Sequence, residues 1–259
     1  MKKARIAIIG GTGFEDSLQK GIKTRIGTRY GPSPTLNLST ISGKNIVFLP
    51  RHGEGHVVPP HKINNRANIF ALHSLDVERI LATNMVGALN PKYALGDIVI
   101  PSDFIDFTQA RHFTFYDDAP VTHVDVSELY CPELREILYK AAKKRVDNVW
   151  TDAVYLITEG PRYESPAEIR MFRTWGCDIV GMTGMPEAIL AHELEMCYAT
   201  ICFVSNMAAG MQKKVSAEEV LEESKIVKKL VWDILEETIA NIPNKRSCFC
   251  SNALEGTRV

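Results

Sequence analysis

The sequence lacks an excess of charge of either sign, and it lacks any long hydrophobic run. Thirty basic residues nearly balance 31 acidic residues in a chain of 259. Because a nucleic-acid-binding protein needs a basic excess to neutralise phosphates, we expect no nucleic-acid partner. No apolar stretch approaches the roughly 18 residues that span a membrane, and the apolar segment at the N-terminus is shorter than that of a signal peptide. We therefore predict a cytoplasmic protein without a membrane partner.

Internal repeats and low-complexity linkers are also absent from the sequence. Hydrophobic residues make up 45% of the chain, which is long enough to bury a sizeable core. We therefore predict a single domain that covers residues 1–259.

The chain contains six cysteines. Cys248-Phe249-Cys250 has one spacer residue rather than the roughly two to four that are common in zinc sites, and no histidine follows it. We therefore expect no metal site. Cytosolic thiols of a mesophile stay reduced, but intracellular disulfides occur in hyperthermophiles. In a thermophilic host, Cys248 and Cys250, together with Cys131 and Cys202, are candidates for disulfides.

Short apolar runs alternate along the chain with helical patterns. The predicted strands are residues 5–10, 45–50, 79–84, 97–101, 153–158, 178–182 and 199–205. The predicted helices are residues 61–75, 132–144, 166–175, 186–195 and 217–241. Several strands are continuously apolar, as strands buried on both faces are. The alternation predicts an α/β fold, with one three-layer domain in which helices flank a mixed, largely parallel sheet.

A glycine-rich turn, Gly10-Gly11-Thr12-Gly13, follows the first predicted strand and is suited to an anion. A dinucleotide-binding turn would need a third glycine where Asp16 stands, and a carboxylate there would repel a pyrophosphate. Tyr139 and Lys143, with Ser127 upstream, have the spacing of a short-chain dehydrogenase site. Because the pair lies in a charged amphipathic helix, where such spacing is ordinary, we do not favour a dehydrogenase.

Five further motifs lie at the ends of predicted strands, where parallel sheets bind their ligands. They are Pro50-Arg51-His52-Gly53, Thr83–Ala88, Thr158–Glu164, Met182–Pro186 and Ser205–Met211. The arginine and histidine of the first motif can donate hydrogen bonds to a phosphate. The other motifs bring an aromatic ring, a carboxylate and an amide. Together they predict one composite site, with anion donors at one end and groups for an organic ligand at the other.

These motifs resemble those of the trimeric purine nucleoside phosphorylase and methylthioadenosine phosphorylase family, in order and approximate spacing over nearly the whole chain. The resemblance implies a phosphorylase that acts on a small nucleoside without a cofactor, because inorganic phosphate is a co-substrate. It also implies a homo-oligomer, either a trimer or a dimer of trimers. His112 or Phe113 would then reach the site of a neighbouring subunit.

The resemblance also implies a role for each matching residue. The phosphate-binding residues would be Thr12, Arg51, His52, Met85 through its backbone, and Thr183. The substrate-binding residues would be Tyr163, Glu164, Met182, Asn206 and Ala217, and among these Glu164 and Asn206 would assist catalysis at the purine. Met85 departs from the small residue expected there, although a contact through the backbone N–H tolerates this change.

The two ends of the expected substrate point to different members of the family. Glu164 can accept a hydrogen bond from N1–H of a 6-oxopurine, and Asn206 can serve both O6 and N7. An aspartate at that position would instead favour adenine. Ala217 stands where purine nucleoside phosphorylases usually have a histidine for the 5′-hydroxyl, so it favours a 5′-methylthio group unless His56 or water serves the hydroxyl. The sequence thus leaves methylthioinosine, inosine or guanosine, and methylthioadenosine open.

Two rival classes of protein have to be distinguished from a phosphorylase: a hydrolytic nucleosidase and a nucleoside-binding protein without activity. A hydrolytic nucleosidase would use water in place of phosphate, which the anion donors at Arg51, His52 and Thr183 argue against. A nucleoside-binding protein without activity could share the fold, but each of the matching residues has chemistry suited to catalysis.

Overall fold

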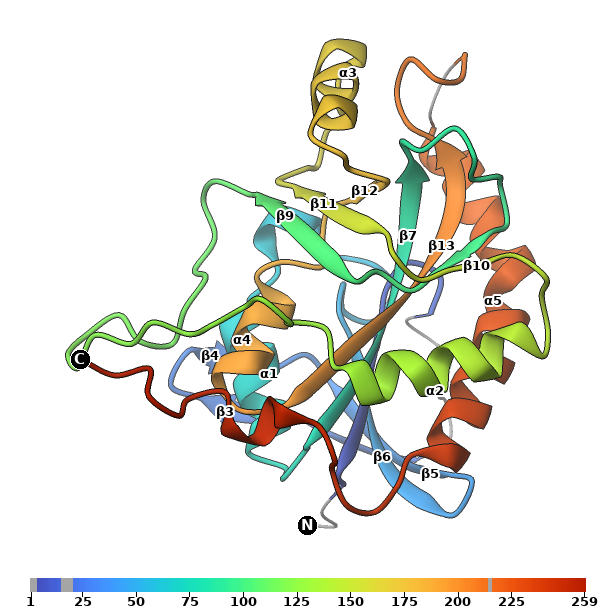
Figure 1. Ribbon diagram of the computed structural model, residues 1–259. Helices are drawn as coiled ribbons and strands as arrows, with labels where there is room; N and C mark the ends of the chain where they lie inside the picture. The colour runs from blue at the N-terminus through green and yellow to red at the C-terminus, as the bar shows by residue number, and fades with distance from the viewer. Residues whose placement is uncertain (1–3, 15–20, 214–215) are drawn as a thin grey trace.

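A computed structural model describes residues 4–14, 21–213 and 216–259, and within these it forms an 11-stranded sheet with helices on both faces (Figure 1). The strands are β1 (Ile6–Gly10), β2 (Ile22–Thr24), β3 (Gly27–Thr28), β4 (Gly31–Pro32), β5 (Leu36–Ile41), β6 (Lys44–Pro50), β7 (Arg79–Ala88), β8 (Ile98–Val99), β9 (Asp103–Phe107), β10 (Val149–Trp150), β11 (Val154–Thr158), β12 (Ile179–Gly181) and β13 (Cys197–Met207). The helices are η1 (Pro60–Lys62), α1 (Asn65–His73), α2 (Pro132–Lys143), α3 (Pro166–Thr174), α4 (Glu187–Glu193), α5 (Ala217–Asn241) and η2 (Phe249–Asn252).

The sheet is mixed, as the sequence predicts. Its main path runs β10-β8-β13-β7-β1-β6-β5-β2, and β3 pairs with β4 in a separate small sheet. The neighbouring pairs β13-β7, β7-β1 and β1-β6 are parallel, whereas β5 and β2 add antiparallel strands at one edge. Strands β11, β12 and β9 branch from β7 through an antiparallel contact with β12. The central strands are almost entirely buried, which explains their continuously apolar sequences.

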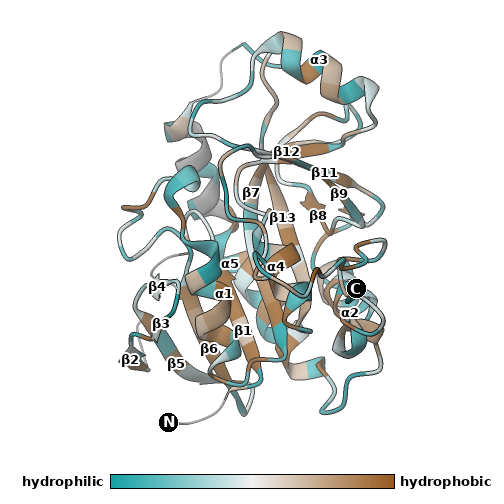
Figure 2. Cartoon of the chain, turned by 90° about the vertical axis from the view of Figure 1, so that its left-hand side faces the viewer, coloured by the Kyte–Doolittle hydropathy of each residue, from teal (hydrophilic) through white to brown (hydrophobic). Residues whose placement is uncertain are grey.

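Helices cover the two faces of the sheet and enclose two hydrophobic cores. One core packs α1 and α4 against the sheet, and the other packs α2 and α5 against its opposite face. Figure 2 shows the hydrophobic strands between these two layers of helices. In α5, the predicted apolar stripe buries Val227, Val231, Ile234 and Leu235. The predicted three-layer α/β class is therefore confirmed.

Two predicted strands end later than the sequence indicated. Strand β7 continues to Ala88 and β13 continues to Met207, so residues 83–88 lie within a strand rather than in a loop after it. Polar and small residues continue these strands because they line a cavity and pair with other strands there. The predicted helix over residues 61–75 is also interrupted, because η1 ends before Asn64 caps α1.

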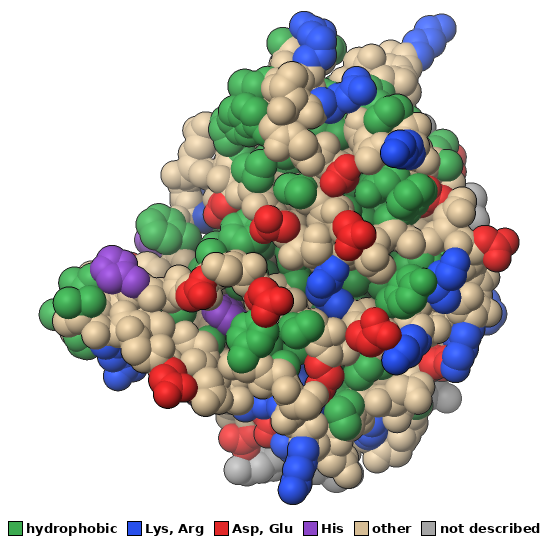
Figure 3. All heavy atoms as spheres, viewed as in Figure 1, with side chains coloured by type: hydrophobic (Ala, Val, Ile, Leu, Met, Phe, Trp, Pro, Cys, Tyr) green, Lys and Arg blue, Asp and Glu red, His purple; other side chains and the backbone are tan. Residues whose placement is uncertain are grey.

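The surface carries acidic and basic side chains side by side, which agrees with the balanced composition. Figure 3 shows them interspersed over one face of the molecule. Within the described part of the chain, no helix combines the length and the apolar character that crossing a membrane requires.

The structure changes one of the cysteine predictions. All six cysteines are free thiols, and Cys131 lies beside Cys248 and Cys250, a grouping that the sequence did not predict. Their fourth neighbour is Cys197, not Cys202. These two residues are five positions apart on β13, and side chains an odd number of positions apart point to opposite faces of a strand. The pairing that we predicted for Cys202 is therefore wrong.

Candidate active site

All ten predicted site residues lie on the wall of one cavity of about 340 Å³. The cavity is lined by Gly11, Thr12, Arg51, His52, His56, Pro60, residues 84–87, Pro161, Tyr163, Glu164, residues 180–183, Ser205, Asn206, Ala208, Ala209 and Ala217. These residues come from the ends of six strands and from the start of α5. Asp16, which argued against a dinucleotide site, lies outside the described residues.

The glycine turn after β1 packs directly on β7. The backbone N–H of Gly11 donates a 2.9 Å hydrogen bond to Thr83 Oγ1. A Cβ atom at Gly11 would lie 2.5 Å from the carbonyl oxygen of Thr83 and 2.8 Å from Arg51 Nη1. Only glycine fits such a close approach of two backbones. The turn therefore holds Thr12 at the cavity wall beside Arg51.

Arg51, which follows β6, is the cation of the cavity wall, and it is buried. Its Nε and Nη2 atoms donate to Glu187 over 2.7 Å each, and Nη1 donates to the carbonyl oxygen of Thr83. Burial opposes the charge, but the attraction of the Glu187 carboxylate and the hydrogen bonds that it accepts outweigh this effect and raise the pKa of Arg51. These bonds use three of the five guanidinium N–H groups, so two can face an anion.

Glu187 is a site residue that the sequence reasoning missed. It begins α4, and its Oε1 atom accepts a second hydrogen bond, 2.7 Å long, from the Tyr198 hydroxyl of β13. The carboxylate is completely buried, so it holds the guanidinium of Arg51 in one orientation. No local sequence pattern pointed to Glu187, because its partner Arg51 lies 136 positions away in the chain.

His52 lies next to Arg51 and is also buried. Its Nδ1 atom is 2.8 Å from the carbonyl oxygen of Val58, and its ring stacks on His56 with centroids 4.3 Å apart. An imidazole that donates from Nδ1 turns its Nε2 edge away from Val58. Both histidines line the cavity, so the imidazole of His56 lies beside that of His52, the residue next to Arg51.

A chain of hydrogen bonds joins Thr183 to the centre of the sheet. Thr183 Oγ1 donates to Asn84 Oδ1, and Asn84 Nδ2 donates to Thr200 Oγ1, each over 2.7 Å. Thr183 can donate a hydrogen bond to a phosphate through its backbone N–H, or through its hydroxyl when the hydroxyl turns away from Asn84. Met85, the next residue of β7, also lies on the wall.

The opposite end of the cavity holds a buried carboxylate. Glu164 Oε1 accepts a 2.6 Å hydrogen bond from Thr158 Oγ1 at the end of β11. Burial disfavours the ionised form and raises the pKa of Glu164, although the hydrogen bond from Thr158 opposes this effect. Tyr163 is 39% exposed at the mouth, and Met182 packs beneath Gly160. The carboxylate thus shares the cavity wall with an aromatic ring and a thioether.

Asn206 owes its position to a β-bulge. The register between β13 and β7 shifts between Val204 and Asn206, and such bulges re-aim side chains at sites. Asn206 Oδ1 accepts from the Ser205 hydroxyl over 2.8 Å, and Nδ2 donates to the Met207 carbonyl oxygen over 3.0 Å. One lone pair and one N–H of the amide remain for a ligand.

Ala217, at the start of α5, also lines the cavity and contributes only a methyl group to its wall. His112 and Phe113 do not line the cavity of their own chain, and Phe113 is 63% exposed. Their predicted contact with a neighbouring subunit stays a prediction. The same loop contains Arg111, which the sequence reasoning did not select. Arg111 donates to the carbonyl oxygens of Met185 and Glu159 and thereby anchors the loop at the ends of the strands.

Comparison with known proteins identifies the family. The sequence model of one protein family, the phosphorylase superfamily, matches residues 5–240 of this chain. The chain belongs to the phosphorylase superfamily. This agrees with the family that the sequence motifs predicted.

Two relatives and one solved structure illustrate what the chain is similar to. A probable S-methyl-5′-thioinosine phosphorylase of Methanopyrus kandleri is 50% identical, over 98% of this chain and 99% of the relative. The 6-oxopurine nucleoside phosphorylase of Pyrococcus furiosus is 46% identical, over 97% of this chain and 98% of the relative. A methylthioadenosine phosphorylase from Schistosoma mansoni, solved in complex with adenine, has a TM-score of 0.91 and 32% identity, with 99% of both chains covered.

Proposed function

We propose that this phosphorylase cleaves the N-glycosidic bond of 6-oxopurine nucleosides with inorganic phosphate. The products are the free base and ribose 1-phosphate, or its 5-methylthio derivative. The observation that carries the proposal is the single cavity whose wall holds Arg51 beside Thr83 of β7, Asn206 beside Gly87 farther along the same strand, and the carboxylate of Glu164. The relatives from Methanopyrus and Pyrococcus, which are named as phosphorylases of S-methyl-5′-thioinosine and of 6-oxopurine nucleosides, support it.

The reaction needs positioning and charge stabilisation rather than a protein nucleophile. The bond between C1′ and the purine N9 breaks, the base takes its electron pair, and positive charge develops on the sugar. A phosphate oxygen held by Arg51, His52 and Thr12 then bonds to C1′. The departing base gains a proton, and Asn206 accepts a hydrogen bond from N7–H. Met182 and Tyr163 enclose the sugar.

The polar groups at the base end favour a 6-oxopurine. A carboxylate at Glu164 accepts a hydrogen bond from N1–H, and the remaining N–H of Asn206 donates to O6. The remaining lone pair of Asn206 accepts from N7–H. With adenine, the amide N–H of Asn206 would face another donor at N6. A buried mismatch of this kind costs roughly 1–3 kcal/mol, which favours hypoxanthine by about 5- to 150-fold.

The apolar wall near Ala217 favours a methylthio group at the 5′ position. Ala217 and Pro60 offer no hydrogen-bond donor through their side chains, and burying a methylthio group against them removes apolar surface from water. We therefore place 5′-methylthioinosine first. Inosine or guanosine comes next, with His56 or water at the 5′-hydroxyl, and 5′-methylthioadenosine comes last.

Three further expectations belong to this proposal. The catalytic reaction uses no cofactor, because phosphate is a co-substrate and the wall supplies the groups that the chemistry requires. The working form is a homo-oligomer, either a trimer or a dimer of trimers. The protein acts in the cytoplasm.

A steady-state assay with and without phosphate tests the proposal on 5′-methylthioinosine, inosine and 5′-methylthioadenosine. We expect hypoxanthine release that depends on phosphate and is fastest from 5′-methylthioinosine. Fastest release from inosine would support Asn206 as the residue that selects a 6-oxopurine, and it would contradict the proposal that Ala217 favours a methylthio group. Preference for 5′-methylthioadenosine would overturn the assignment at the base. Equal release without phosphate would identify a hydrolytic nucleosidase, and absence of turnover despite nucleoside binding would identify a binding protein.

A further inference from the structure

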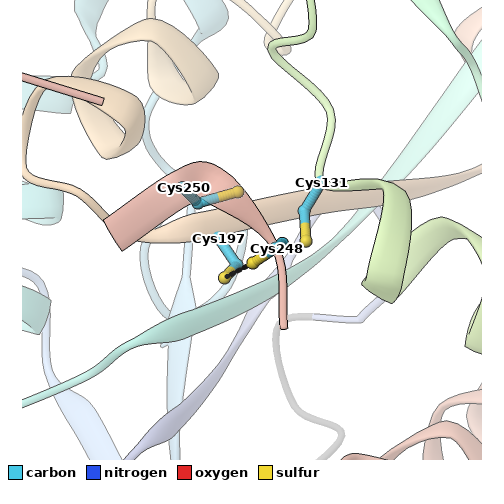
Figure 4. A group of neighbouring side chains, drawn as sticks. All are labelled: Cys131, Cys197, Cys248 and Cys250. Carbon is cyan, nitrogen blue, oxygen red and sulfur yellow. Dashed lines mark hydrogen bonds between the residues drawn. The ribbon is translucent and has the colours of Figure 1, made fainter. Parts of the chain in front are cut away.

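Four cysteines from three distant segments converge in one place, which we name the cysteine cluster. Its members are Cys131, Cys197, Cys248 and Cys250. Cys131 precedes α2, Cys197 begins β13, and the other two lie at η2 near the C-terminus. The four sulfur atoms all lie within 4.8 Å of one another, and those of Cys197 and Cys248 are 3.3 Å apart. Figure 4 shows the four side chains gathering from these separate segments.

The backbone around the cysteine cluster is held by hydrogen bonds. The N–H of Cys131 donates to the carbonyl oxygen of Tyr198 over 2.8 Å, which fixes the start of α2 against β13. Ser247 donates through its backbone N–H and its hydroxyl to Glu133 Oε2. Arg246 donates to the carbonyl oxygen of Glu195. The C-terminal segment is thus anchored on both neighbouring segments immediately before it delivers its two thiols.

The arrangement has the dimensions of a tetrahedral metal site. Tetrahedral zinc–sulfur bonds of about 2.3 Å place thiolates about 3.8 Å apart, and the observed sulfur atoms need only small movements to reach this spacing. Three of the cysteines are buried and Cys248 is half-buried. We propose that the cysteine cluster binds one Zn²⁺ as four thiolates. Binding breaks four S–H bonds, forms four Zn–S bonds and releases four protons to solvent.

Nearby groups suit the two net negative charges of a zinc tetrathiolate. Arg79 is the register partner of Cys197 on the neighbouring strand β7, so both side chains leave the same face of the sheet. Its guanidinium is buried, contacts Glu133 near the start of α2, and has no hydrogen-bond partner at Nε among the described residues.

The location indicates a structural role for the metal. Cys197 begins β13, whereas Asn206 lies near the other end of the same strand, and none of the cluster residues lines the cavity. Zinc at the cluster would tie the C-terminal segment to β13 and α2. The spacing of Cys248 and Cys250 argued against a metal in the sequence, because the other two ligands come from positions that only the fold brings near.

The first experiment uses the wild-type protein, purified anaerobically in reducing buffer without chelator. We expect about one zinc per chain by elemental analysis, released in step with titration of four thiols by a mercurial reagent. Adding Co²⁺ to the metal-depleted protein should give the thiolate-to-cobalt absorption of a tetrahedral four-sulfur site. Absence of both stoichiometric metal and this absorption would overturn the proposal. Recovery of the four thiols as disulfides after such a purification would also overturn it.

A matched pair of variants separates the cluster from the other thiols. Cys250→Ser should lower bound zinc to below about one tenth per chain, whereas Cys177→Ser, a buried thiol outside the cluster, should retain it. Removing zinc from the wild type should lower the melting temperature by about 5 °C or more, with unchanged kcat/KM for nucleoside below the transition. If Cys250→Ser binds zinc as tightly as Cys177→Ser does, the cluster is not the metal site.

Discussion

Glu187 accepts two hydrogen bonds from the guanidinium of Arg51, each 2.7 Å long, and neither side chain has any exposed surface. A bidentate pair of this kind fixes the guanidinium plane as well as its position. The two N–H groups of Arg51 that remain are therefore held in place before an anion arrives. Such preorganisation is what stabilises a transferred anion in a water-excluded site.

The first prediction concerns phosphate binding by Arg51. Arg51→Lys keeps a positive charge but loses the planar set of donors, so we expect the KM for phosphate to rise at least about tenfold. The KM for nucleoside should change less than about threefold, because the base end of the cavity is untouched. Steady-state kinetics at saturating concentrations of the other substrate would measure both. Equal effects on the two constants would reassign Arg51 to a structural role.

The second prediction separates binding from folding at the same pair. Arg51→Met alone leaves the Glu187 carboxylate buried without its cation and should cost about 3–5 kcal/mol of unfolding free energy. The double variant Arg51→Met/Glu187→Gln removes both charges, so it should recover most of this stability. Denaturant unfolding would measure the recovery, and phosphate kinetics should stay impaired in both variants. Recovery of phosphate binding in the double variant would contradict the role that we give Arg51.

The sequence could predict the fold class because the central strands carry a local signal. Strands buried on both faces are continuously apolar, and α2, α3 and α5 begin where the sequence placed them. Strands such as β2, β9 and β10 were not predicted, since they are short or partly exposed and lack that signal. Their pairing depends on neighbours that are distant in the chain.

Some functional residues could be predicted from the sequence, and others could not. Residues such as Arg51 and Asn206 follow apolar runs, so local pattern and family resemblance together located them. Glu187 supports the site from a helix, and Cys197 joins the cysteine cluster from the start of a strand. Neither has a local sequence signal, because each acquires its role through contacts with residues more than 50 positions away.

The third prediction concerns the choice of base. Asn206→Asp removes the N–H that would donate to O6 and supplies an acceptor for an amino group at position 6. We expect the ratio of kcat/KM for 5′-methylthioinosine over 5′-methylthioadenosine to fall at least about tenfold. Asn206→Ala is the matched control, because it removes the amide without supplying that acceptor and should weaken both substrates. An unchanged ratio in Asn206→Asp would remove Asn206 from base recognition.

The fourth prediction concerns the 5′ position. Ala217→His replaces a methyl group on the cavity wall with a hydrogen-bonding ring. We expect the preference for 5′-methylthioinosine over inosine to fall at least about tenfold, because the ring fills the methylthio space and can reach a 5′-hydroxyl. Competition between the two substrates in one mixture would measure the ratio directly. Ala217→Val controls for bulk alone and should weaken both substrates without favouring inosine.

The last prediction follows from the buried carboxylate of Glu164. Burial raises its pKa from the ordinary 4.5, so protonation begins at a higher pH than for an exposed glutamate. The ionised carboxylate accepts from N1–H of a 6-oxopurine, whereas the protonated acid can donate to N1 of an adenine. As pH falls through this raised pKa, kcat/KM for 5′-methylthioinosine should therefore fall relative to that for 5′-methylthioadenosine. The ratio cancels the ionisation of phosphate, which affects both substrates alike.

Two variants give this pH profile its controls. Thr158→Val removes the 2.6 Å hydrogen bond that favours the ionised form of Glu164, so the fall in the ratio should begin at a still higher pH. Glu164→Gln cannot titrate, so its ratio should be lower and independent of pH over the same range. If the wild-type ratio is flat, or if its pH dependence persists in Glu164→Gln, another group governs the choice of base. A shift of the pH profile to higher pH in Thr158→Val, together with loss of the pH dependence in Glu164→Gln, would place the titrating proton on Glu164 itself.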